Sequence, residues 1–334
     1  MHQALSGSSS KTPLNQSEQN NYTNSTDFLS KKEFNLYDTH AHLDLLLKQE
    51  GFWPNLRDEE LVSRSFSDAK DNLNLNNYAL DYSPEINIFL EENLQKHSWI
   101  VQPTCSTLNF LQCWPLIQNS KIYLLVGSHP EIVKPEFNLE KYLEFQRQAV
   151  NFIQSNENLK SRTVGIGECG LDYFYSQDSQ IVQTQKALFK SQIELALELN
   201  LPLIIHCRDA FEDLFEILTN YPAIHGKFLI HCFTGNLQQA TKIVELGGIM
   251  AVGGILTFSS AKHLVEAVQN TNLENFVLET DLPFLAPNPF RGKTCRPEMI
   301  ENTLHKLAEI KQIEASDILI ESKLKAQRFF KLDV

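Results

Sequence analysis

The chain has 334 residues, of which 42% are hydrophobic and 21% charged, an ordinary balance for a folded protein. Its formal net charge of −12 at pH 7 argues against a broad basic surface that grips nucleic acid over a long footprint. The charge does not exclude an enzyme that engages only one or two phosphates, and no apolar run approaches the length of a membrane span.

The first 33 residues differ in composition from the rest of the chain. They are rich in Ser, Asn, Gln and Thr, contain no Arg, and lack the apolar stretch of a secretory signal. We therefore predict a disordered tail over residues 1–33, with a targeting role as the alternative. Residues 34–334 show no further break in composition, which predicts one folded domain.

Strand-like and helix-like patterns alternate through this domain. Phe189, Ile193 and Ala196 recur at helical spacing, and Asn236 and Ser316 are expected to cap later helices. The apolar runs expected to form strands lie near residues 34–39, 99–104, 122–127, 163–168, 202–206, 227–231, 248–253 and 275–280. About eight strand–helix repeats predict an α/β fold, a (β/α)8 TIM barrel whose site lies at the C-terminal face of the strands.

Two histidines follow the first predicted strand, in the segment Asp38-Thr39-His40-Ala41-His42. Side chains alternate between the faces of a strand, so His40 and His42 point the same way and could share one divalent cation. Alone, the pair is equally well explained as two surface histidines. Ligand-type residues also end later apolar runs, at Glu168, His206, His231 and Asp281. Together these residues predict a metal site.

The six cysteines do not form a disulfide pattern. Cys169, Cys207 and Cys232 each directly follow a candidate ligand, and the Cys-x-x-Cys clustering of a thiolate zinc site is absent. We interpret them as small buried side chains in a reducing compartment. This predicts a cytoplasmic protein, with the nucleus as the alternative in a eukaryote.

Six segments resemble successive signatures of the TatD family of metal-dependent hydrolases, which belongs to the amidohydrolase-like barrels. The segments are residues 38–44 (DTHAHLD), 127–130 (GSHP), 167–173 (GECGLDY), 205–210 (IHCRDA), 230–235 (IHCFTG) and 279–287 (ETDLPFLAP). The resemblance runs from about residue 34 to the C-terminus. Many members of the family are described as deoxyribonucleases, so the resemblance implies a nuclease that depends on divalent metal.

The resemblance also implies a set of metal ligands. One metal is expected within His40, His42, Glu168 and Asp281, and the second within Glu168, His206 and His231. Glu168 is then a carboxylate bridge between two ions. The mixture of imidazole and carboxylate suits Zn, Mn or Co, whereas the resemblance also allows Mg.

The chemistry implied is phosphodiester hydrolysis by a hydroxide held between the two metals, with Asp281 accepting a proton from the attacking water. His129 is expected to contact the substrate phosphate. Arg208 and Arg291 are further candidates for that role, with surface or ion-pairing arginines as the alternative. DNA is expected as a transient substrate, and no obligate protein partner is predicted.

Two features depart from the family pattern. An insertion at about residues 49–84 follows the first strand, and the first outer helix of the barrel is expected at about 85–97. The insertion is either a peripheral excursion or a lid that selects strand ends. The second departure is Cys295-Arg296-Pro297, where an Asn-Glu-Pro-like sequence is expected.

The leading functional prediction is a 3′–5′ exonuclease acting on single-stranded DNA. An amide, ester or aminoacyl-bond hydrolase using the same binuclear site is the alternative, because one barrel supports several chemistries. A non-catalytic metal-binding or interaction protein is a further alternative, although no expected ligand is missing.

Overall fold

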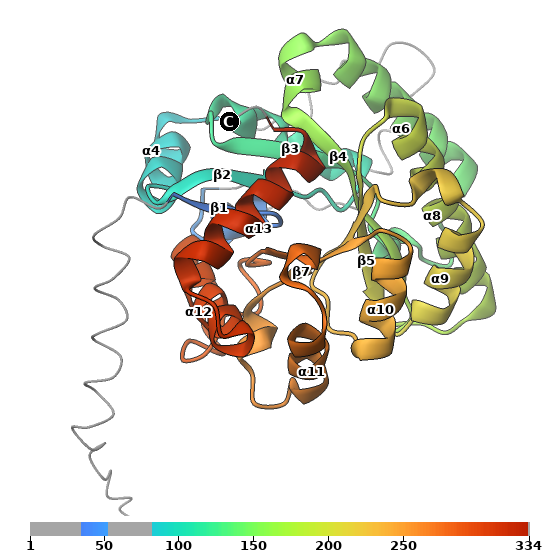
Figure 1. Cartoon of the computed structure of the whole chain (residues 1–334). Helices are drawn as coiled ribbons and strands as arrows, with labels where there is room; N and C mark the ends of the chain where they lie inside the picture. The colour runs from blue at the N-terminus through green and yellow to red at the C-terminus, as the bar shows by residue number, and fades with distance from the viewer. Residues whose placement is uncertain (1–34, 53–81, 333–334) are drawn as a thin grey trace, which may run out of the picture. The chain divides into compact units, whose positions relative to one another are not determined.

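The computed structural model describes residues 35–52 and 82–332. Within them, eight parallel strands form one sheet in sequence order, and helices lie around it (Figure 1). The strands are β1 (Leu36–Asp38), β2 (His97–Gln102), β3 (Ile122–Val126), β4 (Thr163–Asp172), β5 (Leu203–Arg208), β6 (Phe228–Ile230), β7 (Ile249–Val252) and β8 (Phe276–Leu278). All eight overlap their predicted ranges, so the predicted TIM barrel is confirmed.

Helices connect successive strands, and two more follow the last strand. They are α2 (Leu43–Gln49), α4 (Pro84–Asn93), α5 (Thr107–Cys113), α6 (Leu139–Ser155), α7 (Glu157–Arg162), α8 (Ser179–Leu199), α9 (Phe211–Thr219), α10 (Leu237–Glu245), α11 (Lys262–Asn270), α12 (Ile300–Lys311) and α13 (Ala315–Phe330). Short 3-10 helices are η2 (Trp114–Gln118), η3 (Pro130–Ile132), η4 (Pro222–Ile224), η5 (Gly254–Thr257), η6 (Leu273–Asn275) and η7 (Pro297–Met299). Among the described residues, none of the helices combines the length and hydropathy needed to cross a bilayer.

Contacts between the first and last strands bring the two ends of the sheet together. The backbone N–H of Thr39 donates to the Leu278 carbonyl at 3.2 Å, and the Leu278 N–H donates to the Tyr37 hydroxyl at 3.0 Å. The Thr280 N–H and hydroxyl both donate to the Asp38 carboxylate. Since Asp38 is the last residue of β1 and Thr280 lies two residues beyond β8, this closure also joins the two loops at that end of the barrel.

The largest difference from the predicted strands is in β4, which continues to Asp172 rather than ending at Glu168. Its pairing with β5 is interrupted between Ile166 and Cys169 and then resumes as far as Asp172 opposite Arg208. Both strands therefore extend beyond the predicted ends. As a consequence Glu168 and His206 project from within strands rather than from the loops after them.

The helix ends agree with the predictions in part. Asn236 caps α10 through the Gln239 N–H, as predicted, and the Gln239 side chain completes a capping box. Ser316 was the wrong cap for α13, because the backbone is already helical from Ala315 and Glu314 occupies the N-cap position. The predicted helix at 85–97 is also too long, because His97 pairs with Leu36 as the first residue of β2.

Two predictions concern segments outside the described residues. These are the tail at 1–33 and most of the insertion at 49–84, of which 53–81 is not described. The described part of the insertion begins in helix α2, which ends at Gln49.

We predict that the aromatic cluster around Trp99 is essential for stability. Trp99 is fully buried, with ring centroids 4.9 Å from Tyr37 and 6.5 Å from Phe330 of α13. Trp99→Ala should lower the free energy of unfolding by about 3–5 kcal/mol because it leaves a large cavity. Urea denaturation followed by circular dichroism measures this loss.

The matched control is Ile88→Ala on α4, where the side chain is exposed. This change should shift the free energy of unfolding by less than about 0.5 kcal/mol. Equal losses in the two variants would show that the Trp99 cluster does not contribute specially to stability.

Candidate metal centre

The predicted ligands meet at the C-terminal ends of β1, β4, β5, β6 and β8. The loops after β1 and β8 are tied together, because the Asp281 N–H donates to the His40 carbonyl at 2.9 Å and the His42 N–H donates to the Leu282 carbonyl at 2.9 Å. Residues more than 200 positions apart in the sequence thereby share one site.

Glu168 lies at the centre of this group, nearly fully buried. Its Oε2 atom lies 3.3 Å from His40 Nε2 and 3.6 Å from His42 Nε2. Asp281 faces the same two histidines, with Oδ1 3.6 Å from His42 Nε2 and 3.9 Å from His40 Nε2. Two imidazoles and two carboxylates thus surround one small space.

The other Glu168 oxygen faces a different set of imidazoles. Oε1 lies 2.8 Å from His231 Nε2, 3.0 Å from His206 Nδ1 and 3.4 Å from His129 Nε2. One carboxylate therefore addresses two separate groups of nitrogen atoms through its two oxygens. This is the arrangement that a carboxylate bridging two cations requires.

Several buried nitrogen atoms in the site have no hydrogen-bond partner among the described residues. They are Nδ1 and Nε2 of His40, Nδ1 of His42 and Nδ1 of His231. Burial, followed by repulsion from His231, lowers the pKa of His40 well below its usual value. A neutral imidazole with a free lone pair is the form that binds a metal ion. The residues present therefore fit a divalent cation.

The carboxylates of the site are too close together to remain charged without nearby positive charge. Burial and then the adjacent Glu168 raise the pKa of Asp281 well above its usual value. Burial also acts to raise the pKa of Glu168, but His231 and His129 together hold it well below the usual value. Cations bound between the two carboxylates would favour the ionised form of both.

Three carboxylates behind the ligands were not predicted from the sequence. Asp172 Oδ2 lies 3.1 Å from His206 Nε2, on the side of the ring away from Glu168. Glu279 is fully buried, with Oε1 3.9 Å from His231 Nδ1. Asp38 accepts a hydrogen bond from the His40 N–H at 3.0 Å. The Asp172 carboxylate is placed to orient the His206 ring and increase its basicity, whereas Asp38 holds the backbone that carries His40 and Glu279 lies behind His231 without a hydrogen bond to its ring.

The spacing of two of these carboxylates was a usable signal in the sequence. Asp38 precedes His40 by two residues and Glu279 precedes Asp281 by two, the period at which side chains return to one face of a strand. Asp172 carried no such signal, because its partner His206 is on the neighbouring strand.

The predicted phosphate-binding residues occupy three different places. His129 lies within the cluster itself, near Glu168 and His206, so it could also act as a ligand. Arg208 is exposed and lies over the ring of Phe174, and Arg291 lies over Phe258. Neither arginine forms an ion pair with a described residue, which leaves both available for a phosphate.

The cysteine interpretation holds in part. All six cysteines are free, and the candidate metal groups among the described residues contain no thiol. Cys169 is buried as expected, whereas Cys207 and Cys232 are partly exposed. Burial raises the pKa of Cys169 and Cys232 well above the usual value, which disfavours thiolate ligation.

The second departure from the family pattern lies at the edge of this site. The Cys295 N–H donates to the Pro283 carbonyl at 2.9 Å, and Arg296 forms an ion pair with Glu50, just after α2. Arg296 therefore links the loop after β8 to the start of the insertion. As a partly exposed pair it contributes little stability.

The profile of the family described as TatD related DNase matches residues 37–331. The chain belongs to this family. It is 37% identical to the uncharacterized metal-dependent hydrolase YabD of Bacillus subtilis (strain 168), over 52% of the chain and 67% of YabD. The crystal structure of YJJV, a TatD homolog from Escherichia coli K12, superposes with a TM-score of 0.69 at 25% identity and covers 90% of this chain and all of that one.

A further relative carries a functional name. The human 3′-5′ RNA nuclease TATDN2 is 28% identical over 88% of this chain, which spans 35% of the length of TATDN2. Together with the histidine and carboxylate groups, these relationships identify the chain as a metal-dependent hydrolase of the TatD family.

We predict that Asp172 positions His206 for metal binding. Asp172→Asn removes the charge that orients the imidazole and should weaken metal affinity or activity about 10- to 100-fold. Competition with a chelating dye measures the affinity directly. Glu266→Gln, at an exposed position on α11, is the matched control and should leave it unchanged. Unaltered affinity in Asp172→Asn would contradict the assigned role.

Proposed function

We propose that this protein is a 3′–5′ exonuclease that hydrolyses phosphodiester bonds of single-stranded DNA. The observation that carries the proposal is the position of Glu168, whose two carboxylate oxygens face two separate groups of histidines. We infer two divalent cations, Mg, Mn or Zn, in these two groups. Membership of the TatD related DNase family supports phosphodiester chemistry.

When bound, the cations supply Lewis-acid polarisation of the phosphate and activation of a water nucleophile. Glu168 holds the two groups of ligands at a fixed separation. Asp281 is the proposed base, because its side chain is 13% exposed, against 4% for Glu168. With Oδ1 toward His40 and His42, its other carboxylate oxygen can accept the proton of the attacking water.

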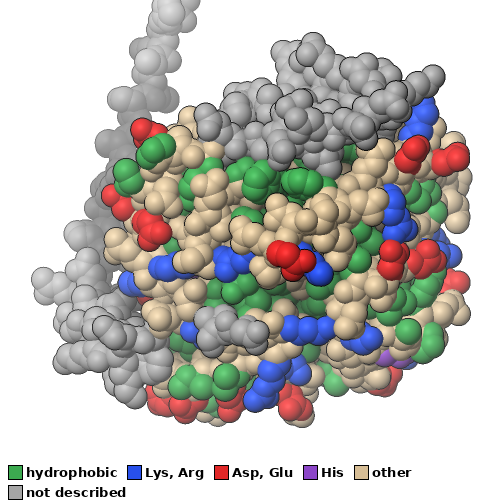
Figure 2. All heavy atoms as spheres, turned by 90° about the horizontal axis from the view of Figure 1, so that it is seen from above, with side chains coloured by type: hydrophobic (Ala, Val, Ile, Leu, Met, Phe, Trp, Pro, Cys, Tyr) green, Lys and Arg blue, Asp and Glu red, His purple; other side chains and the backbone are tan. Residues whose placement is uncertain are grey.

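Residues around the cluster are proposed to hold the substrate. His129 Nε2 points into the site, where as an N–H donor it would contact a non-bridging phosphate oxygen. Arg208 supplies an unpaired positive charge at the edge of the site. On the face seen in Figure 2, basic and acidic side chains of the described residues are interspersed. The net charge of −12 and the absence of a uniformly basic area on the described part of this face support a short contact with a strand end rather than a long duplex footprint.

RNA is a second candidate substrate. The observation that favours it is the likeness to human TATDN2, a protein named as a 3′-5′ RNA nuclease. That name also supports the proposed polarity of degradation. An amide, ester or aminoacyl bond remains the alternative for the same metal site, since the fold alone does not select the substrate.

The first test uses 5′-labelled single-stranded DNA and the matching RNA, with protein supplied with Mn, Mg or Zn. We expect stepwise shortening from the 3′ end that stops with a chelator and is lost in Glu168→Ala. Denaturing gels resolve the products. Intact nucleic acid in the presence of confirmed bound metal would contradict the nuclease proposal and favour amide or ester hydrolysis.

A second prediction concerns the base. Asp281→Asn retains a metal-facing oxygen but cannot accept the proton, so bound metal should persist while kcat falls about 10²- to 10⁴-fold. Metal content and single-turnover rates are measured on the same sample. The rate should not change in the control Glu245→Gln, at an exposed position on α10. An unchanged rate in Asp281→Asn would exclude Asp281 as the base.

A further inference from the structure

Two highly exposed aromatic side chains lie next to each other just beyond β4. Phe174 is 55% exposed and Tyr175 is 66% exposed. Their ring centroids are 4.9 Å apart, and the rings are almost perpendicular. Exposed neighbouring aromatics are uncommon on a surface that only faces water, and they mark a binding site when a specific ligand chemistry is nearby.

Arg208 from the end of β5 completes this group. Its guanidinium carbon lies 3.5 Å from the centroid of the Phe174 ring and 5.5 Å from that of Tyr175. Among the described residues Arg208 forms no ion pair, so the ring is its main partner. We call Phe174, Tyr175 and Arg208 the aromatic platform.

The aromatic platform lies close to the candidate metal centre. Arg208 is two residues beyond the ligand His206, which corresponds to about 6–7 Å along a strand. Phe174 is likewise two residues beyond Asp172, which pairs with Arg208 in the sheet. A substrate whose phosphate occupies the metal centre therefore has an adjacent nucleotide within reach of the platform.

The backbone beneath the platform is held by hydrogen bonds. The Phe174 N–H donates to Asp172 Oδ1 at 2.9 Å, while the other oxygen of that carboxylate faces His206. The Tyr173 hydroxyl donates to Asp213 at 2.7 Å, and Asp213 pairs with Lys186 of α8. The Asp172 carboxylate thus positions both the candidate ligand His206 and the backbone of the platform. The platform is therefore pre-organised for binding.

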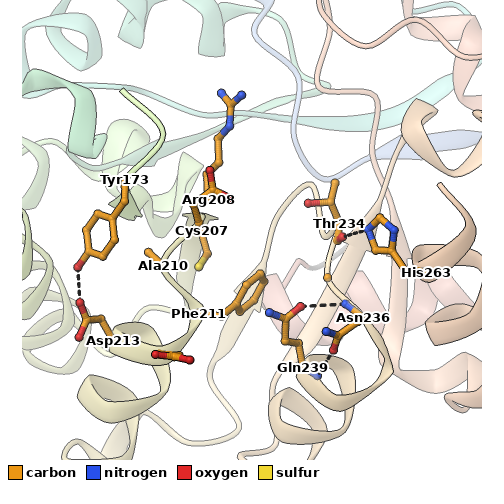
Figure 3. A pocket seen from close by; sticks show the side chains of 13 residues that line it. Tyr173, Cys207, Arg208, Ala210, Phe211, Asp213, Thr234, Asn236, Gln239 and His263 are labelled. Atoms are coloured by element: carbon orange, nitrogen blue, oxygen red, sulfur yellow. Dashed lines mark hydrogen bonds between the residues drawn. The ribbon is translucent and has the colours of Figure 1, made fainter. Parts of the chain in front are cut away.

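The surroundings favour a base over a phosphate as the occupant. A cavity of about 640 Å³ lies between the loops after β5 and β6, and its lining includes Asp209, Glu212 and Asp213. Arg208 also lines this cavity, and Asp213 is already paired with Lys186, but the carboxylates of Asp209 and Glu212 would repel a phosphate there. Figure 3 shows Arg208 extending away from Phe211 and Asp213 of this cavity. The guanidinium is therefore directed toward the aromatic rings rather than toward the acidic lining.

We propose that the aromatic platform stacks an unpaired base of the substrate beside the scissile phosphate, and thereby selects single-stranded nucleic acid. This inference rests on the proposed function. Stacking on aromatic and guanidinium planes tolerates every base, because every base has a π-face. A base within a duplex is already stacked and paired, so it would have to be extruded before it could use the platform.

The experiment separates stacking from phosphate binding. Native protein, Phe174→Leu and Tyr175→Leu are assayed on single-stranded DNA and on the same oligonucleotide with a base-free tetrahydrofuran analogue at the terminal or the penultimate position. On normal DNA each variant should lose about 5- to 150-fold in kcat/KM, mainly through KM. On one of the base-free substrates the loss should be less than about twofold, because the stacking partner is absent.

Further variants sharpen the assignment. Phe174→Trp retains an aromatic face and should restore kcat/KM on normal DNA to within about threefold. Leu324→Ala, at a 45% exposed position on α13, is the control for removing exposed apolar surface and should behave as the native protein. Equal losses on normal and on both base-free substrates, or no loss on either, would overturn the stacking proposal.

A binding assay distinguishes failure of the platform from failure of the nuclease proposal. Glu168→Ala, which should not cleave, is titrated with fluorescent single-stranded DNA, with and without the base-free position. Adding Phe174→Leu should raise Kd for normal DNA about 5- to 150-fold and leave Kd for the base-free strand unchanged. Equal affinity of the Glu168→Ala protein for the two strands would exclude stacking, whether or not the native protein cleaves DNA.

Discussion

The structure depends on one buried carboxylate. Glu168 brings its two oxygens within 2.8–3.6 Å of five imidazoles that come from four different strands or the loops after them. A buried carboxylate is costly unless it is paired, and buried imidazoles without partners add to that cost. Divalent cations bound between these groups, as we propose, would neutralise the carboxylate and supply partners for the imidazoles. The buried carboxylate and imidazoles would destabilise a metal-free fold, but they also form two groups of candidate ligands, one on each oxygen of Glu168. The barrel holds these two groups in place.

The candidate metal site also requires the closure between β1 and β8, because this closure places His40, His42 and Asp281 on one side of Glu168. Asp38 takes part in this closure through Thr280 and also accepts the N–H of His40, so a structural hydrogen-bond network continues directly into the site. Asp172 has a similar double role on the opposite side, where it contacts His206 and the backbone of Phe174. In our proposal, the orientation of the metal ligands and the contact with substrate are therefore coupled through shared carboxylates.

The charge of the chain fits the same functional interpretation. An acidic chain with interspersed surface charges cannot rely on a long electrostatic footprint, so affinity has to come from contacts near the scissile bond. The metal centre and His129 serve the phosphate in our proposal, and the aromatic platform serves a neighbouring base. Single strands can offer both groups at once, because their bases are free to leave the stack.

The sequence alone determined the eight strands, the (β/α)8 barrel and the candidate ligands, because strand periodicity and ligand-type residues at strand ends are local signals. Tertiary structure decided which groups meet. The pairing of Asp172 with His206, the continuation of β4 beyond Glu168 and the stacking of Arg208 on Phe174 all depend on the register between β4 and β5. The approach of Glu279 to His231 likewise joins the segments after β8 and β6, although the position of Glu279 two residues before Asp281 is a local pattern. Register is a relation between segments, set by the packing of the whole barrel, so no pattern within one segment contains it.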